Sequence, residues 1–403
     1  MKEALNIVPT LLGADFNAYS VAMAFHSAFG VKSHAFGRYK CGLSDFSRIV
    51  KIEFCSGYES NSVFLPELIS FAEKNKGKKL VLIPCADCYV EFINENRDEL
   101  SKYYSFLVPK DELVKRLTDK AAFYRELSRC GIDFPEFIEL KEGDNYQKKL
   151  GRLSYPAVLK PAVSAEYWRH PFPSMRKVYY PSDKDEAARI VSELRCYGYK
   201  DGIVLQRLVP KCEIYVYTAL YDKGGKRDFG VLGRVVLEEI GKTSAGNHSA
   251  IITEEGAVIT DKLDKMLEEL GYTGFANFDI LKSEGKYYVL ELNARQGRSC
   301  DYIRCAGINI GERLLSLLGI KESVKKNDYE RIFWHYPPLS SALKYMTEYD
   351  KAEALLLKKK GRAWSALCYS PDLWLNPLRQ GYVLLHGRRV SKRLASDFEE
   401  KAR

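Results

Sequence analysis

The 403-residue chain lacks several features that would assign it to a class directly. No run of about eighteen apolar residues is present, which excludes a transmembrane helix, and the N-terminal apolar run is too short for a secretory signal. The ten cysteines show no paired framework, because the CxxC of Cys85 and Cys88 has no second CxxC or histidine pair to complete a zinc site. We therefore expect a cytoplasmic protein whose thiols are reduced and mostly structural.

Common short motifs for nucleotide binding and catalysis are also missing. The sequence contains no GxGxxG, GxxxxGK[ST], GxSxG or HExxH, and it has no HRD motif to pair with the DFG at 228–230 as in kinases. Of only six histidines, His248 in AGNHS could serve as a base or a phosphate contact, although a structural role is at least as well supported. The net charge of +9 is modest and suits anionic small substrates as well as nucleic acid or a membrane surface. A phosphate site must therefore be built without these motifs.

The most informative stretch is 275–299, FANFDILKSEGKYYVLELNARQGRS, which predicts a hairpin with its turn at 283–286. Side chains alternate between the two faces of a strand, and here the even-numbered positions are apolar and the odd-numbered ones polar. A three-residue loop would place Asp279 opposite Glu291 and Asn277 opposite Asn293. Opposed like charges destabilise a sheet, and Mg²⁺, which prefers carboxylate oxygens, would remove that cost. The alternative is a solvated face with incidental acids. The apolar face would comprise Phe278, Ile280, Leu290 and Leu292.

The N-terminal part predicts two units of strand, turn and helix. Residues 5–12 form an apolar run, Gly13 and Asp15 stand in a turn, and a helical pattern follows; residues 79–93 repeat this order. The turn and the helix N-terminus suit an anion or a polar substrate. Asp87, at the second turn, could contact substrate, although an aspartate there more often caps a helix. Residues 1–110 therefore predict a small α/β domain with a parallel sheet.

The rest of the chain has a different pattern. Residues 111–130 predict one helix that ends at Gly131, and residues 111–325 as a whole predict antiparallel strands mixed with helices. A long polar loop at 162–175 separates two of these strands, and loops of this kind are functional or disordered.

The C-terminal segment is basic. From residue 351 onward, twelve Lys or Arg stand against five Asp or Glu, a local balance of +7. Trp364, Trp374 and several leucines interleave with the basic residues, a composition that can touch anionic lipid at a membrane interface. The alternative is a solvated helical extension packed on the body. We expect residues 326–403 to form a basic, helical C-terminal extension in either case.

An ordered series of motifs in this chain resembles the ATP-grasp superfamily of carboxylate–amine and carboxylate–thiol ligases, from about residue 5 to about residue 320. Each motif alone is weak, and the order makes the series specific. Within the superfamily, IVPTLLGADFNAYSVAMAFHSAFG near the start, YTGFANFD (272–279) and ELNARQGRS (291–299) are similar to the D-aspartate ligases of cell-wall cross-bridge synthesis. The series consists of Lys120, Lys160 in AVLKP, a loop, QRLVPKCE (206–213), FDI with Asp279, and ELN with Glu291 and Asn293.

The resemblance implies a fold that combines α/β and α+β parts. An N-terminal Rossmann-like (pre-ATP-grasp) domain at 1–110 would precede an ATP-grasp domain at 111–325, with its central lid at about 155–209, and the basic extension at 326–403 would follow. ATP and magnesium, two ions, are the implied cofactors. The nucleotide would be held through its phosphates by Lys120 and Lys160, through its adenine by Gln206, Arg207 and Val209, and through its ribose hydroxyls by Glu213.

The resemblance also assigns the metal and the reaction centre. The magnesium ligands would be Asp279, Glu291 and Asn293. Three features depart from the family pattern. Gln206 replaces a more usual glutamate, Asn277 stands where several relatives carry an arginine, and the loop 162–175 has no glycine, so that its phosphate contacts would come from Ala162, Ser164 and Ala165. The oxyanion would meet the backbone N–H of Gly297, and the substrate carboxylate and reacting phosphate would lie near Arg295, Arg298 and Ser299.

The implied activity is an ATP-dependent ligase that activates an amino-acid carboxylate, with D-aspartate expected, and forms an amide with an amine. The amine would be the lysine side chain of a UDP-linked or lipid-linked peptidoglycan precursor, and no nucleic acid is expected as a partner. Two alternatives are a ligase for a free amino acid or specialised metabolite and a non-catalytic nucleotide-binding protein, which the intact Asp279, Glu291 and Asn293 disfavour. The protein would be cytoplasmic, with peripheral contact at the inner membrane face left open.

Overall fold

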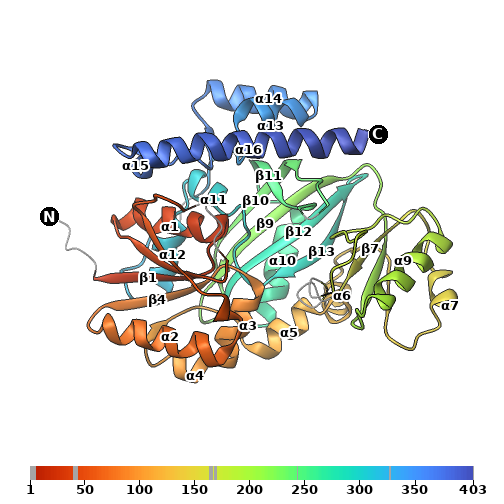
Figure 1. The fold of residues 1–403 in the computed structure, drawn as a ribbon, viewed down its shortest axis with the longest axis horizontal. Coiled ribbons are helices and arrows are strands. Elements are labelled where there is room, and N and C mark those ends of the chain that lie inside the picture. Colours follow the sequence, from red (N-terminus) through yellow and green to blue (C-terminus); the bar gives the residue numbers. More distant parts are fainter. Residues whose placement is uncertain are drawn as a thin grey trace.

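The computed structural model describes residues 6–39, 44–162, 167, 170–242, 244–325 and 328–402 and arranges them around three sheets (Figure 1). The first sheet has five parallel strands in the order β3-β2-β1-β4-β5, which confirms the predicted parallel α/β pattern. Its elements are β1 (Ile7–Leu12), α1 (Phe16–Phe29), β2 (Ser33–Gly37), β3 (Val50–Phe54), a 3₁₀ turn (Ser56–Glu59), α2 (Asn61–Lys74), β4 (Lys79–Pro84), α3 (Asp87–Glu95), α4 (Arg97–Leu100) and β5 (Tyr104–Ser105).

A small antiparallel sheet, in the order β6-β8-β7, forms a lobe at the right of Figure 1. The lobe has its own apolar cluster, which includes Leu159, Val191 and Leu205. Its inner strand ends at Arg207, where the chain turns towards the largest sheet. The lobe comprises β6 (Phe137–Leu140), α7 (Tyr146–Leu150), β7 (Ala157–Pro161), α9 (Lys184–Cys196) and β8 (Ile203–Arg207).

The third sheet has seven strands in the order β13-β12-β9-β10-β11-β14-β15. The predicted hairpin 275–299 lies at one edge of this sheet, so that one of its strands pairs with β9 and the other is an edge strand. The elements of this part are β9 (Glu213–Tyr221), β10 (Arg227–Glu238), β11 (His248–Glu254), α10 (Val258–Glu269), β12 (Gly274–Ser283), β13 (Lys286–Asn293), α11 (Asp301–Cys305), α12 (Ile310–Leu317), β14 (Phe333–His335) and β15 (Ala363–Ser365).

The connection between the first two sheets differs from the single helix predicted over 111–130. The structure has two helices, α5 (Asp111–Thr118) and α6 (Lys120–Arg129), separated by Asp119. Asp119 has extended backbone angles, and its side chain accepts the N–H of Ala122, so it caps the second helix and breaks the first. Lys120 therefore stands at the first position of a helix rather than in the middle of one.

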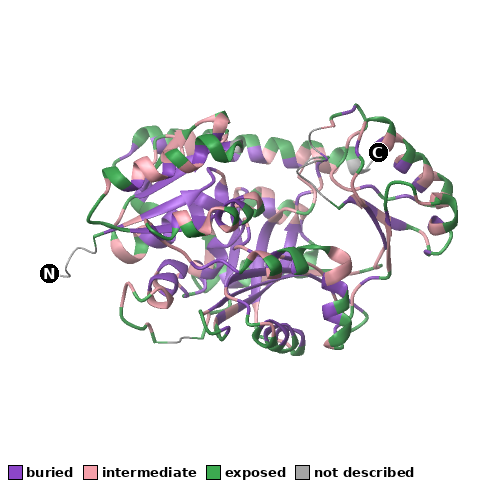
Figure 2. Cartoon of the chain, turned by 90° about the horizontal axis from the view of Figure 1, so that it is seen from below, coloured by how far each residue is buried: buried purple, intermediate pink, exposed green. Residues whose placement is uncertain are grey.

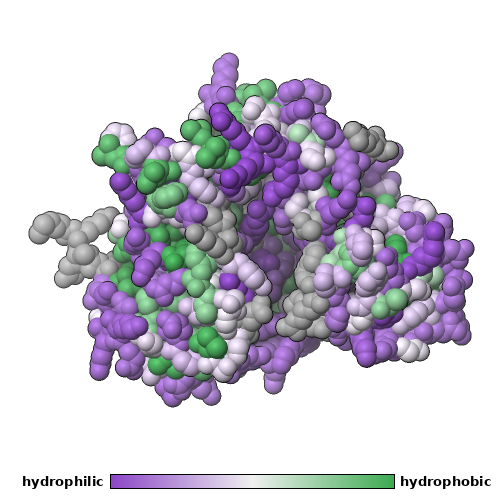
Figure 3. All heavy atoms as spheres, in the orientation of Figure 1, coloured by the Kyte–Doolittle hydropathy of each residue, from purple (hydrophilic) through white to green (hydrophobic). Residues whose placement is uncertain are grey.

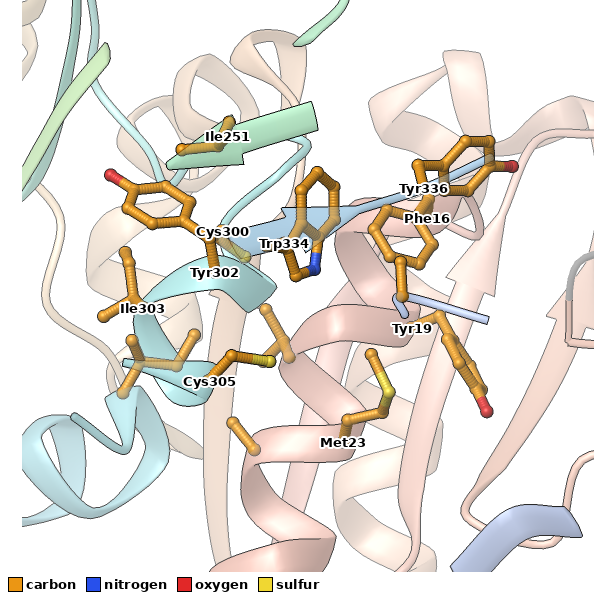
Figure 4. Packing of buried hydrophobic residues seen from close by; sticks show 14 of the residues in the cluster. Phe16, Tyr19, Met23, Ile251, Cys300, Tyr302, Ile303, Cys305, Trp334 and Tyr336 are labelled. Atoms are coloured by element: carbon orange, nitrogen blue, oxygen red, sulfur yellow. The ribbon is translucent and has the colours of Figure 1, made fainter. Parts of the chain in front are cut away.

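The largest core joins the N-terminal sheet to the seven-stranded sheet. The buried strands of both sheets are visible in Figure 2, whose helices expose one side to solvent. Phe16 of α1 packs against Trp334 of β14 and against Tyr336, and Met23 of α1 and Tyr302 of α11 belong to the same apolar cluster (Figure 4). Because one continuous cluster covers both sheets, residues from the β1–α1 turn and from the loop after β13 are held in fixed relation to each other.

The C-terminal segment packs across the top of the body in Figure 1 and adds two strands, β14 and β15, that the sequence analysis did not predict. Asp372 is fully buried, accepts a hydrogen bond from Tyr19 at 2.7 Å and lies 3.1 Å from Nε of Arg379. No helix in the described part of the chain is long and apolar enough to cross a membrane. The helices here are α13 (Leu339–Tyr345), α14 (Glu348–Lys359), α15 (Ser370–Leu373) and α16 (Pro377–Ala402).

Candidate active site

The hairpin of β12 and β13 has the facing pairs predicted from side-chain alternation. Asp279 is paired with Glu291, and Asn277 with Asn293. The loop has two residues rather than the three expected, since Ser283 pairs with Lys286. A bulge beyond Asp279 compensates for the shorter loop, so the polar pairs keep the predicted register.

The bulge changes which residues reach the core. Ile280 pairs with Val289, and Val289 is fully buried among apolar side chains. Leu290 is only partly buried and lines a cavity beside Glu291. The prediction that Leu290 lies on the apolar face was therefore wrong, because alternation is interrupted where one strand carries an extra residue.

Two lysines from different elements converge on Glu291. Nζ of Lys120 lies 3.1 Å, and Nζ of Lys160 3.6 Å, from the same Glu291 oxygen. Lys120 is brought there by the start of α6 and Lys160 by the end of β7, 40 residues later in the chain. Both lysines lower the pKa of the Glu291 carboxyl, while burial and the neighbouring Lys160 lower the pKa of Lys120. The structure thus brings together the two predicted phosphate-binding lysines and a predicted metal ligand.

Asp279 faces this cluster as a buried carboxyl group that lacks a hydrogen-bond partner at one oxygen within the described residues and lies opposite a second carboxylate. Its Oδ1 atom is buried without a hydrogen-bond partner among the described residues, and Nε2 of His248 lies 4.0 Å away. Burial and the facing Glu291 raise the pKa of Asp279, and burial lowers the pKa of His248 to about 4. A divalent cation would satisfy the orphaned oxygen and relieve the repulsion between the two carboxylates.

The protein offers few oxygen ligands for a metal ion held by side chains alone. The described residues contain no cluster of three or more His, Cys, Asp and Glu side chains that could bind a metal. Asp279, Glu291 and the amide oxygen of Asn293 would leave positions open for water or substrate oxygens, as Mg²⁺ sites usually do. The residues therefore fit magnesium brought in with a phosphate-bearing substrate.

A cavity of about 350 Å³ opens above this cluster, between the small lobe and the seven-stranded sheet. Figure 3 shows a hollow lined by hydrophilic residues in the middle of the molecule. Val158 and Leu290 contribute apolar surface to its lining. The residues singled out from the sequence that line it are Lys120, Lys160, Ala162, Gln206, Arg207, Val209, His248, Asp279 and Glu291.

Gln206 is buried in the cavity wall and has a partner within the protein. Its amide donates a hydrogen bond to the hydroxyl of Tyr124, which in turn donates to the backbone carbonyl of Leu290 at 2.9 Å. This chain of hydrogen bonds orients the amide of Gln206 and links the hinge after β8 to β13. Ser164 and Ala165 of the predicted phosphate loop lie outside the described residues.

Glu213, predicted to accept the ribose hydroxyls, lies away from the cavity lining. It accepts a hydrogen bond from Tyr215 at 3.2 Å and lies 4.0 Å from Lys282, on the face of β9 opposite to that of Ile214. Glu238, at the end of β10, is a carboxylate in the lining that the sequence analysis missed. No motif marks it, and only the pairing of β10 with β11 brings it beside His248.

The segment after β13 carries the remaining predicted site residues. Arg295 is 2.9 Å from Asp87 and 3.2 Å from the Asn293 amide oxygen, so Asp87 positions a basic group next to a predicted metal ligand. Gly297 is packed so closely that a Cβ atom there would lie 2.5 Å from Oδ1 of Asn277.

The two remaining predicted residues differ in exposure. Ser299 is buried at 4 % exposure, whereas the Arg298 side chain is 33 % exposed and pairs with Glu239. Asp15 caps α1 close by; burial raises its pKa, and Arg298 and Arg295 oppose that shift. The turn after β1 and the loop after β13 therefore meet at one polar site.

The fold and this arrangement of lysines and acids agree with the predicted class, the ATP-dependent carboxylate–amine ligases of the ATP-grasp superfamily. No protein-family model matches the chain. Its sequence is similar to the D-aspartate ligase of Enterococcus faecium (strain Aus0004), with 28% identity over 388 residues that cover 92% of each protein. This similarity confirms the resemblance stated from the motifs.

Solved structures confirm the fold. The biotin carboxylase domain of Hydrogenobacter thermophilus 2-oxoglutarate carboxylase, solved with MgADP, superposes with a TM-score of 0.61 at 14% identity over 81% of this chain and 73% of that one. The L-amino acid ligase of Bacillus licheniformis gives a TM-score of 0.54 at 16% identity, over 77% and 74% of the two chains. At these identities the likeness concerns the fold, and the substrate needs a separate argument.

Proposed function

We propose that this protein uses ATP and magnesium to convert an amino-acid carboxylate into an acylphosphate, which an amine then attacks to form an amide. The observation that carries the proposal is the convergence of Lys120 and Lys160 on Glu291, in the lining of a cavity and opposite an Asp279 oxygen that has no hydrogen-bond partner within the described part of the chain. Paired lysines suit phosphates, and paired carboxylates suit the cation that accompanies them. The proposal divides the chain into the three parts 1–110, 111–325 and 326–403.

The residues around the cavity have separate tasks in this reaction. A carboxylate is a poor acyl donor because it has no leaving group, and phosphoryl transfer supplies one. Lys120 and Lys160 would turn from Glu291 to the phosphate oxygens when ATP binds. Magnesium, with two ions expected, would neutralise the transferred phosphoryl group and be held by Asp279, Glu291 and Asn293.

When the amine attacks the acylphosphate, a negative charge develops on the carbonyl oxygen, and this oxyanion also needs stabilisation. We assign the hydrogen bond to the oxyanion to the backbone N–H of Gly297, and Arg295, held by Asp87, would supply fixed positive charge beside it. Because Asp87 and the adjacent Asn293 both restrain Arg295, its guanidinium needs little reorganisation as the charge develops. Glu238, in the cavity lining, is the candidate for the ribose contact first assigned to Glu213.

We propose D-aspartate as the acid and the lysine side chain of a UDP-linked or lipid-linked peptidoglycan precursor as the amine. Support comes from the similarity to an enzyme named D-aspartate ligase over nearly the whole chain. The test is ADP release measured across a panel of acids and amines. Release that requires both D-aspartate and the precursor supports the proposal, and release with free amino acids as both substrates supports the alternative ligase. ADP release in the absence of any acid would overturn the ligase proposal. So would the absence of ADP release with every combination of acid and amine in the panel.

The exposed face of α16 supports a second, separate proposal, a weak contact with an anionic membrane surface. Apolar residues gather where α15 ends and α16 begins (Figure 3). The same solvent-facing side of α16 continues with exposed basic residues and has no acidic residue before Asp397, so it combines apolar and positive surface. The exposed residues are Trp374, Leu375, Leu378, Leu384, Leu385, Arg388, Arg389 and Lys392.

Sedimentation with vesicles tests this contact. The protein should sediment with phosphatidylglycerol vesicles and not with phosphatidylcholine vesicles, and less so at high salt. The double variant Leu384→Ser/Leu385→Ser should lose most of this binding. The matched control Leu355→Ser/Leu356→Ser changes two exposed leucines on α14 and should bind as the unaltered protein does. Equal sedimentation of all three proteins, or of none, would remove the membrane proposal.

A further inference from the structure

A second cavity, of about 480 Å³, adjoins the cavity that Lys120 and Lys160 line, which is called the nucleotide cavity from here on. Its volume lies in the range of pockets that bind small molecules or single side chains of larger partners. The two cavities lie next to each other because several residues line both. The shared residues are Val178, Tyr180, Leu208, Glu238 and Ala245.

Three parts of the chain form the walls of the second cavity. The small lobe provides one wall, the end of β10 and the loop after it provide another, and α16 provides the third. The C-terminal end of α16 points towards the lobe in Figure 1. The C-terminal helix therefore closes a space next to the nucleotide cavity. Its residues in this lining are Asp397 and Glu400.

The second cavity borders the reaction centre at two points. Glu239 lines the cavity and lies 3.4 Å from Nη1 of Arg298, in the segment after β13 that carries the assigned oxyanion donor. Glu238 lines both cavities and is paired across the sheet with His248. Nε2 of His248 lies 4.0 Å from Asp279 on the metal side. A ligand in the second cavity is therefore close to both the metal side and the acyl side of the reaction.

Three substrates must meet at one carbonyl carbon, and two of them already have a place. The nucleotide is assigned to the nucleotide cavity, with its phosphates at Lys120 and Lys160. The acid is assigned to the segment after β13, where this segment meets the β1–α1 turn. The amine must reach the carbonyl carbon from another side, and the second cavity borders both of these sites.

The walls of the second cavity suit an amine at the end of an aliphatic chain. Val178, Leu208 and Ile240 provide apolar surface, and the ring of Tyr180 is 61 % exposed beside them. A lysine side chain packs its methylene groups along such surface and keeps its charged end in polar surroundings.

The polar part of the lining contains more carboxylates than cations. Glu239 is already compensated from outside the cavity by Arg298 and by Arg393, whose Nη2 atom lies 3.1 Å away. The charged residues of the lining are Glu238, Glu239, Asp397 and Glu400 against Arg176 and Lys242.

The two carboxylates from α16 differ in their partners. Glu400 lies 2.9 Å from Lys242, and Lys242, with Arg176 from the lobe, lowers the pKa of its carboxyl group. Oδ2 of Asp397 is buried without a hydrogen-bond partner within the described residues. Burial raises the pKa of Asp397, while Arg393 one turn earlier opposes that shift. An ammonium group in the cavity would stabilise the charged form of Asp397.

We propose that the second cavity binds the amine substrate as an alkylammonium side chain, with Asp397 and Glu400 of the C-terminal helix facing its charged end. This inference rests on the proposed ligase function and adds a site for the amine and a task for α16. After the ammonium group has released a proton to water, its nitrogen attacks the carbonyl carbon of the acylphosphate. The C–N bond forms, the bond from that carbon to the phosphate oxygen breaks, and inorganic phosphate leaves with the electron pair.

The test compares two nucleophiles that attack the same acylphosphate. Hydroxylamine is small and mostly uncharged at neutral pH, so it needs no binding site and converts the acylphosphate into a hydroxamate and phosphate. In the double variant Asp397→Asn/Glu400→Gln, KM for the UDP-linked lysine precursor should rise about five- to tenfold, because two carboxylates are lost with little change in shape. Hydroxamate formation from ATP, D-aspartate and hydroxylamine should change less than twofold.

A second variant tests the space rather than the charge. Ile240 lines the second cavity and not the nucleotide cavity, so Ile240→Trp reduces the room for the amine alone. It should lower kcat/KM for the precursor by about tenfold or more, while KM for ATP and hydroxamate formation stay within twofold. The control Glu399→Gln changes an exposed carboxylate of α16 outside the lining of both cavities and should change none of these values.

The outcomes separate this inference from the proposed function. An equal fall with the precursor and with hydroxylamine in both variants would show that these residues act on the fold or on acylphosphate formation, and it would overturn the inference. Unchanged use of the precursor by both variants would also overturn it. Either result leaves the ligase proposal standing, because the unaltered protein still forms the hydroxamate. Failure of the unaltered protein to form a hydroxamate with any acid of the panel would overturn both.

Discussion

Replacing Glu291 by glutamine removes one charge from the centre of the site with almost no change in shape. At an effective dielectric constant of about 20, the attraction of Glu291 to Lys120 at 3.1 Å and to Lys160 at 3.6 Å is roughly 5 kcal/mol for each pair. Most of this is cancelled by desolvation of the charges, and the Glu291 side chain is 39 % exposed to the cavity. We therefore expect Glu291→Gln to fold and to lose about 1 kcal/mol of unfolding free energy.

The effect on activity should be much larger than the effect on stability. The glutamine supplies no charge to hold magnesium and removes the carboxylate on which both lysines converge, so ADP release should fall by roughly a hundredfold or more. Urea unfolding and magnesium-dependent ADP release, measured on the same preparations, separate the two effects. Glu284→Gln makes the same substitution at the exposed tip of the hairpin and should leave both measurements unchanged. Near-normal ADP release by Glu291→Gln would refute the assignment of Glu291 to the metal and phosphate site.

Two further predictions concern packing and pH. Gly297→Ala places a methyl group against Asn277, and it should cost about 1–3 kcal/mol of unfolding free energy and lower activity roughly a hundredfold. The control Gly381→Ala lies in open space on α16 and should raise the unfolding free energy, measured in urea, by about 0.5–1 kcal/mol. An active, fully stable Gly297→Ala variant would contradict the close contact. Burial and the arginines around it lower the pKa of His386 to about 4, and its neutral ring is hydrogen-bonded to Tyr336. Because the unfolded chain takes up a proton at His386 more readily than the folded one, the neutral buried ring stabilises the fold above the ordinary histidine pKa of about 6.5. That contribution is lost as pH falls towards 4, so the unfolding free energy should drop by about 2 kcal/mol over that interval. His386→Gln should flatten the urea-derived pH profile, and an unchanged profile would count against the assignment.

Local chemistry explains why much of the site was predictable. Alternation along a strand depends only on neighbouring residues, and it placed Asp279 opposite Glu291 as the structure shows. The loop length and the face of Leu290 were mispredicted because a two-residue turn and a bulge compensate for each other. Residue type alone does not distinguish a short turn with a bulge from a longer loop without one. The break before Lys120 was missed for a related reason, since an aspartate within a helical pattern can either cap a helix or remain exposed in one.

The residue pattern alone predicted the parallel N-terminal sheet and the hairpin with its paired acids. It also contained the ordered lysines that resemble those of the ATP-grasp ligases. Each of these depends on short-range periodicity or on the order of motifs. Only the tertiary structure decided that Glu213 lies off the cavity, that Glu238 lines it, and that Arg393 reaches Glu239 across 154 residues of chain. Such contacts arise when buried charges from separate elements must be neutralised together, and that requirement is met by proximity in space, which the linear pattern does not encode.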